Sequence, residues 1–166
     1  MDDHRWWQDG VIYQVYPRSF LDTNHDGIGD LGGVTEKLDY VSQLGVDAIW
    51  LSPFYPTPDA DFGYDISDHT QVDARFGTMR DFDNLLEQAH KRGIRVIFDI
   101  ATNHISDQHI WFQEARKSKD NPYRNFFIWS KDAKEYADAR IIFYGIEKSN
   151  WKKEGDEYYF HRFFDF

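Results

Sequence analysis

Residues 79–100, MRDFDNLLEQAHKRGIRVIFDI, decide the fold of this chain. The first part predicts a helix over residues 79–92 whose apolar face consists of Phe82, Leu85, Leu86 and Ala89. Gly93 is the expected stop of that helix. The run that follows, residues 94–100, is almost wholly apolar, as expected of a strand buried on both faces. A helix, a glycine and a buried strand in this order are typical of a parallel α/β fold.

The same order extends toward the N-terminus. Residues 11–16 (VIYQVY) and 46–51 (VDAIWL) are rich in β-branched and aromatic side chains and predict two strands. Residues 35–44 lie between them with helical spacing, and Gly45 follows their end. Strand, helix, strand, helix, strand predicts an α/β fold with a parallel sheet and right-handed crossovers. Ligands in such folds bind where the strands end, and the loops there carry most of the unusual residues.

Residues 105–166 differ in character from the part before them. They are polar, rich in aromatic side chains and without further alternation of strands and helices. Residues 111–118 predict a short helix, and residues 158–164 (YYFHRFF) predict a strand. We expect this part to form a small subdomain that follows the third strand.

Length, charge and composition exclude several classes of protein. The chain of 166 residues can bury a core but is shorter than the ~250 residues of a complete (β/α)8 barrel. A net charge of −10 argues against nucleic acid or an anionic membrane as a partner. The absence of cysteine excludes disulfides and thiolate metal sites. No signal peptide or membrane-spanning stretch is visible, so we expect a cytoplasmic protein.

Residues 22–30, DTNHDGIGD, place oxygen donors at every second position. Such spacing suits a hard cation such as Ca²⁺, which takes several oxygens and often a backbone carbonyl. The predicted calcium ligands are Asp22, Asn24, Asp26, the carbonyl of Ile28, and Asp30. An EF-hand is disfavoured because position 12 of the loop is Gly33 rather than glutamate, and because a strand precedes the loop. The remaining alternative is an Asx-rich turn without metal.

Three short segments follow the second and third strands: residues 61–66 (DFGYDI), 71–78 and 99–104 (DIATNH). Each is weak by itself, since Tyr64 could belong to a core and a lone His104 is more often structural. Together with IYQVYPRSF at the first strand and DxNxDGxGDLxG after it, they resemble the α-amylase superfamily, glycoside hydrolase family 13. The resemblance covers essentially the whole chain.

The resemblance implies a pocket for an α-glucoside such as maltose, trehalose or a short oligosaccharide. Asp61 matches the acid that hydrogen-bonds the non-reducing glucose in exo-acting members, and Tyr64 matches the ring that stacks on it. His104 matches the histidine that holds the sugar hydroxyls, and Phe163 matches an aromatic pocket wall. Asp99 is expected to be a structural carboxylate that orders the strand ends.

The resemblance also implies the architecture. Residues 1–104 would be the first three βα units of a (β/α)8 TIM barrel, and residues 105–166 part of the domain inserted after its third strand. Residues 106–129 and 158–164 look most like the trehalose synthase branch, which interconverts maltose and trehalose. Oligo-1,6-glucosidases and other α-glucosidases are the close alternative.

No catalytic residue is expected within the chain. Retaining glycosidases need two carboxyl groups about 5–5.5 Å apart. The resemblance places the nucleophile in an Arg-x-Asp segment, which this sequence lacks. We therefore expect an N-terminal fragment that is inactive without the rest of the barrel. A calcium-dependent sugar-binding module without catalysis is the alternative from another functional class, and a calcium sensor is a weaker one.

Overall fold

The computed structural model describes residues 5–166, which form two compact units. The first unit runs up to Pro56 and includes His69–Ile100. The second unit combines Thr57–Asp68 with Ala101–Phe166. This grouping differs from the predicted division after residue 104, because the excursion that follows the second strand packs with the segment that follows the third.

A parallel sheet forms the centre of the first unit. Its strands are β1 (Ile12–Val15), β2 (Ala48–Leu51) and β3 (Arg95–Phe98), in that spatial order. The register aligns the last residues of the three strands with one another. The loops that follow the strands therefore leave the sheet at the same edge. The predicted strands and their parallel order are confirmed.

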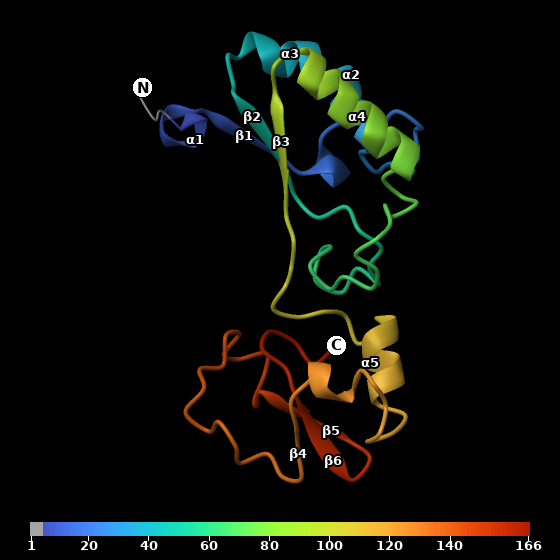
Figure 1. The fold of residues 1–166 in the computed structure, drawn as a ribbon, viewed down its shortest axis with the longest axis vertical. Helices are drawn as coiled ribbons and strands as arrows, with labels where there is room; N and C mark the ends of the chain where they lie inside the picture. The colour runs from blue at the N-terminus through green and yellow to red at the C-terminus, as the bar shows by residue number, and fades with distance from the viewer. Residues whose placement is uncertain (1–4) are drawn as a thin grey trace. The chain divides into compact units, whose positions relative to one another are not determined.

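The α-helices between β1 and β3 lie together beside this sheet (Figure 1). The helical elements are α1 (Trp6–Asp9), the 3₁₀ turn η1 (Pro17–Ser19), α2 (Leu31–Glu36), α3 (Leu38–Gln43) and α4 (Met79–Lys91). Helix α2 packs against α4. The core between helices and sheet includes Val15, Leu31, Val34, Leu38, Val41, Ile49, Leu51, Phe54, Phe76, Leu85, Ala89 and Ile94.

The helix predicted over residues 35–44 is two helices, and the first begins earlier than predicted. Helices α2 and α3 meet at Lys37, where the backbone leaves helical geometry (φ −92°, ψ 6°). The start of α2 at Leu31 was not predicted, because Gly33 is typical of a loop. Gly33 is required there, since a Cβ atom would lie 2.1 Å from the carbonyl oxygen of Leu21. Asp30 caps the helix by accepting a hydrogen bond from the Gly33 amide at 2.6 Å.

The segment 79–100 folds as predicted in its elements but not in its burial. A capping box between Thr78 and Asp81 starts α4, and Leu85 and Ala89 are fully buried on its apolar face. Strand β3 was expected to be buried on both faces, and this is wrong for the described residues. Arg95 and Phe98 (43%) are exposed, and the two residues between them are only partly buried.

The second unit contains a small antiparallel sheet next to α5 (Ile110–Ala115) and the 3₁₀ turn η2 (Arg124–Phe126) (Figure 1). The sheet has the order β4 (Trp129–Ser130), β6 (Glu157–Phe160), β5 (Trp151–Glu154). Aromatic rings fill its core: Phe112 stacks on Trp129 and meets Tyr159 edge-on. The strand predicted over 158–164 ends at Phe160, which frees the next residues to line a cavity.

Within residues 5–166, every helix is too short or too polar to cross a lipid bilayer.

Candidate functional site

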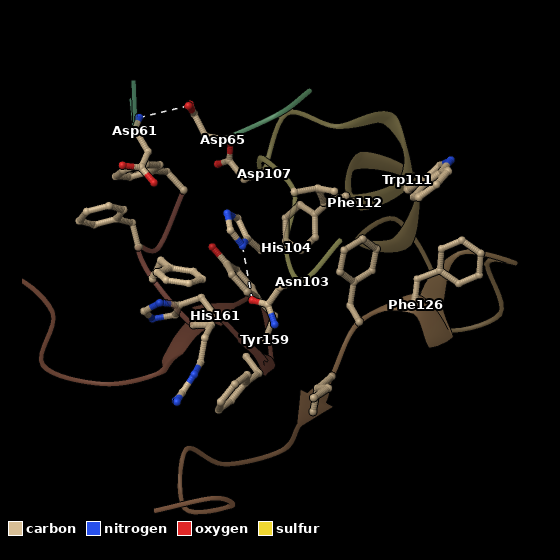
Figure 2. Close-up of a pocket in the computed structure, with 18 of the residues that line it drawn as sticks. Asp61, Asp65, Asn103, His104, Asp107, Trp111, Phe112, Phe126, Tyr159 and His161 are labelled. Carbon is tan, nitrogen blue, oxygen red and sulfur yellow. Dashed lines mark hydrogen bonds between the residues drawn. The ribbon is translucent and has the colours of Figure 1, made fainter. Parts of the chain in front are cut away.

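A cavity of about 440 Å³ lies within the second unit. Its wall is built from three stretches that are distant in sequence: the loop 57–68, residues 102–107 with α5 and the residues up to β4, and residues 159–166. The polar side chains on the wall come mainly from the first two stretches. Figure 2 shows the labelled members of this wall.

Asp65 organises the loop 57–68. Its buried carboxylate accepts hydrogen bonds from the Thr57 hydroxyl (2.6 Å), the Ala60 amide (2.9 Å) and the Asp61 amide (3.1 Å). Three residues of the loop have left-handed backbones, namely Asp59, Phe62 and Gly63. The loop therefore wraps tightly around one carboxylate, and this fixes the backbone of Asp61.

Asp61 lines the cavity, as predicted for a ligand-binding acid. Its carboxylate accepts no hydrogen bond from any residue of the described chain, so its acceptor capacity is open to a ligand. Burial, followed by the negative charge of Asp65, raises the pKa of Asp61, and the charge of His104 opposes this shift.

His104 and Phe163 meet on the same wall. Their ring centroids are 4.6 Å apart, and the Nδ1 atom of His104 lies 3.4 Å from the Asn103 side-chain oxygen. The segment that carries His104 is tied to the loop 57–68 by a hydrogen bond from the Ser106 amide to the Ile66 carbonyl (2.9 Å). The structure thus brings Asp61, His104 and Phe163 together around one cavity.

Tyr64 is placed differently from the other predicted sugar-binding residues. It does not line the cavity, and its side chain is 39% exposed. Its amide donates to the Asp61 carbonyl at 3.0 Å, which closes the tight turn through Phe62 and Gly63. Motif spacing could not reveal this outcome, because the direction of the ring depends on the left-handed residues of the turn. Stacking of Tyr64 on a sugar stays a prediction.

Sequence reasoning missed several residues of the cavity wall, including Asp107, Tyr159 and His161. Asp107 follows His104 by three residues, a position that could have drawn attention once His104 was assigned to a pocket. Tyr159 is 7% exposed, and its hydroxyl donates to the Asp165 carbonyl at 2.8 Å. Burial, then the charges of Asp165 and Asp107, raise the pKa of Tyr159. Its hydroxyl therefore remains protonated at neutral pH.

Asp99 lies in the first unit and is engaged in the fold. Its carboxylate accepts a hydrogen bond from the Trp50 indole at 2.8 Å, and its carbonyl accepts one from the Tyr55 hydroxyl at 3.1 Å. These contacts link the ends of β2 and β3, as expected of a structural carboxylate.

The loop 22–30 is a series of turns closed by its own side chains. The carboxylate of Asp22 accepts from the amides of Asn24 (3.2 Å), His25 (2.7 Å) and Gly27 (2.8 Å). These bonds, that of Gly27 above all, lower the pKa of Asp22. Asp26 accepts from the Ile28 amide and the Asn24 side chain.

The donor chemistry of this loop suits a hard cation, which takes several oxygen ligands. Among residues 5–166, no group of three or more histidine, cysteine, aspartate or glutamate side chains is placed to hold a metal ion. Asp30 is directed toward Thr23 and Gly33 instead, with bonds of 2.6–2.9 Å. The five predicted ligands also include the Asn24 side chain and the Ile28 carbonyl, and calcium binding by this loop stays a prediction.

A model of the alpha-amylase catalytic domain matches residues 14–165 of this chain. Trehalose synthase/amylase TreS of Mycolicibacterium smegmatis is 53% identical over 164 residues, which are 98% of this chain and 28% of that protein. An oligo-1,6-glucosidase of Parageobacillus thermoglucosidasius is 51% identical over 162 residues, 95% of this chain and 28% of that protein. The chain thus spans less than a third of the length of these relatives.

Solved structures agree with the sequence comparisons. The trehalulose synthase MutB of Pseudomonas mesoacidophila matches with a TM-score of 0.90 at 48% identity, over 98% of this chain and 29% of that one. The trehalose-6-phosphate hydrolase of Bacillus licheniformis matches with a TM-score of 0.89 at 46% identity, over 98% of this chain and 30% of that one. A MutB variant has been solved with its substrate sucrose.

Proposed function

Because the chain belongs to the alpha-amylase catalytic-domain family, we propose that it forms the N-terminal part of a retaining α-glucoside-processing enzyme. In this proposal, β1, β2 and β3 with their helices are the first three βα units of a (β/α)8 barrel. The second unit is then part of the domain inserted after the third strand. The proposed activity is trehalose synthase-like interconversion of maltose and trehalose.

The cavity lined by Asp61, His104 and Phe163 is the observation that carries this proposal. A carboxylate can accept hydrogen bonds from two sugar hydroxyls, an imidazole can donate to a third, and an aromatic ring can cover the apolar face. Asp61 is suited to the first task, since its carboxylate is not bonded to described residues. A sugar bound here would hold its terminal glucose between these side chains.

These residues bind and orient the substrate, and the reacting carboxyl groups lie elsewhere in the proposed enzyme. A retaining mechanism needs a nucleophile and an acid/base about 5–5.5 Å apart. Asp65 is already bonded to Thr57, Ala60 and Asp61, so it cannot serve as a nucleophile without loss of the loop. The contribution of this chain is to exclude water and fix the sugar for attack.

Hydrolysis is the second candidate activity, because an oligo-1,6-glucosidase is 51% identical to this chain. Both activities pass through a glucosyl-enzyme intermediate and differ in the acceptor of the second step. The test is to express the full reading frame that contains this chain and incubate it with maltose. Trehalose detected by NMR would support transfer, and release of glucose alone would support hydrolysis. Maltose binding without turnover would contradict both and favour a sugar-binding module.

Calcium binding by the loop 22–30 is a separate proposal, supported by the alternating oxygen donors and the ionised Asp22. The ligands would be Asp22, Asn24, Asp26, the Ile28 carbonyl and Asp30. Their role would be to stiffen the loop between β1 and α2. Titration of the metal-free full-length protein with Ca²⁺ in a calorimeter tests this proposal. Absence of binding heat at millimolar Ca²⁺ would contradict it.

A further inference from the structure

Three aspartates line the cavity of the second unit, and they differ in how their carboxylates are used. Asp65 is fully engaged with the loop 57–68. Asp61 interacts electrostatically with His104. The carboxylate of Asp107 accepts no hydrogen bond and forms no ion pair with any residue in the part of the chain that the structure describes. Like Asp61, Asp107 therefore keeps its carboxylate oxygens available to a ligand.

The backbone that carries Asp107 is nevertheless firmly held. The Asp107 carbonyl accepts a hydrogen bond from the Gln113 side chain at 2.6 Å. On the preceding residue, the Ser106 amide donates to Ile66 and the Ser106 hydroxyl accepts from the Gln108 amide at 3.1 Å. Asp107 thus stands on a fixed turn just before α5, and its side chain is only half-buried.

The arginine on the wall forms no ion pair with Asp107 among the described residues. Arg162 lines the same cavity, but its guanidinium donates to the Arg140 carbonyl at 2.6 Å. Figure 2 labels Asp107 together with Asp65 and His104 among the polar members of the wall. A carboxylate on a fixed backbone inside a cavity, without a protein partner, is available as a hydrogen-bond acceptor for a ligand.

We propose that Asp107 is a second substrate-binding carboxylate, which accepts hydrogen bonds from hydroxyl groups of the α-glucoside that Asp61 does not hold. This inference rests on the proposed function, since it assigns the cavity to a sugar. Each ionised carboxylate offers two oxygens, so Asp61 and Asp107 together can recognise hydroxyls at two places on one substrate. A fixed pair of acceptors would select sugars by the positions of their hydroxyl groups.

The test compares three variants of the full-length enzyme: Asp107→Asn, Asp61→Asn and, as a control outside the cavity, Asp120→Asn. Both cavity variants are expected to lower kcat/KM for maltose by about tenfold or more, mainly through KM, because each removes a charged hydrogen-bond acceptor. Asp120→Asn is expected to leave both constants unchanged. Asp107→Glu, which keeps the charge, should restore part of the loss.

Deoxy analogues of the substrate separate a direct contact from a structural effect. If Asp107 binds one hydroxyl, the penalty of Asp107→Asn should disappear for the analogue that lacks this hydroxyl and persist for the others. That hydroxyl should differ from the one identified with Asp61→Asn. If Asp107→Asn does not fold, the same series with Asp107→Glu answers the question.

An unchanged kcat/KM in Asp107→Asn, or an equal penalty for all deoxy analogues, would overturn the role of Asp107 while leaving the proposed function intact. No binding and no turnover of any α-glucoside by the wild-type enzyme would instead overturn the proposed function, and the role of Asp107 with it.

Discussion

Two aspartate-rich loops, residues 22–30 and 57–65, use the same device for different ends. In each loop one carboxylate accepts several hydrogen bonds from the loop itself. Asp22 accepts from three amides, and Asp65 accepts from two amides and a hydroxyl. Asp22 is partly buried, whereas Asp65 is 3% exposed. The first loop carries further oxygen donors on the exposed Asn24 and Asp26. In the second loop the carboxylate of Asp65 is hydrogen-bonded within the loop, and a different carboxylate, that of Asp61, lines the cavity.

Replacing Asp65 with alanine is expected to have the largest effect of any change in the two loops. Three donors would lose their acceptor at a buried position, which should lower the free energy of unfolding by about 2–4 kcal/mol. Asp65→Asn, which keeps one acceptor oxygen, should lie between this variant and the wild type. Urea unfolding of the full-length protein measures both. A loss below about 0.5 kcal/mol in Asp65→Ala would contradict the central role of Asp65 in the loop.

Gly33→Ala tests how the first loop is anchored to α2. The added Cβ would lie 2.1 Å from the Leu21 carbonyl oxygen, so the backbone must shift. A loss of about 1–3 kcal/mol in stability is expected from this overlap. Gly45→Ala has no such neighbour within 4 Å and isolates the effect of the positive φ at a helix end. Equal losses in the two variants would show that close contact is not the reason for Gly33.

Asp22→Ala should lower the melting temperature less than Asp65→Ala, because Asp22 is less buried than Asp65. If the loop binds Ca²⁺, the difference from wild type should grow when Ca²⁺ is added and shrink when EDTA is added. Differential scanning calorimetry under the two conditions measures this. If the difference in melting temperature does not change with Ca²⁺, the loop is an Asx-rich turn without a bound metal.

The pH dependence of stability should have opposite signs at Asp22 and Asp61, and this is the smallest effect. The pKa of Asp22 is lowered by backbone hydrogen bonds, so Asp22 contributes stability at neutral pH that is lost as pH falls through about 4 and below. Burial raises the pKa of Asp61, so its contribution is present below about pH 4 and is lost as pH rises through the folded-state pKa.

Asparagine variants separate these two signs. Asp61→Asn should therefore raise the melting temperature slightly at pH 7, whereas Asp22→Asn should lower it. Melting curves from pH 3 to pH 8 measure both, and shifts of the same sign at pH 7 would contradict the contrast between the loops.

Much of the fold could be predicted because it depends on local patterns. The spacing of apolar residues and the glycines that follow the helices located α4 and all three strands of the parallel sheet. The alternation of strands and helices predicted that these strands are parallel. The early start of α2 could not be predicted, because the glycine that resembled a loop is required by a contact with Leu21, twelve residues away. The exposure of β3 depends on which parts of the chain pack over its faces, which no local pattern records.

The candidate site was predictable only in part. Motif resemblance identified Asp61, His104 and Phe163, and the structure brings them to one cavity. The structure does not place Tyr64 in that cavity, because the left-handed residues Phe62 and Gly63 set the direction of the turn. Asp107 was missed because no motif marks it. That its carboxylate lines a cavity and accepts no hydrogen bond from the described residues is known only from the structure.

Calorimetric titration of the full-length enzyme with maltose, for the wild type and for Asp61→Asn, tests most directly whether the loop 57–65 presents a carboxylate to a sugar. The loss of a charged acceptor predicts at least tenfold weaker binding in the variant, with a melting temperature equal to or above that of the wild type. Unchanged affinity for maltose in a folded Asp61→Asn variant would contradict the account.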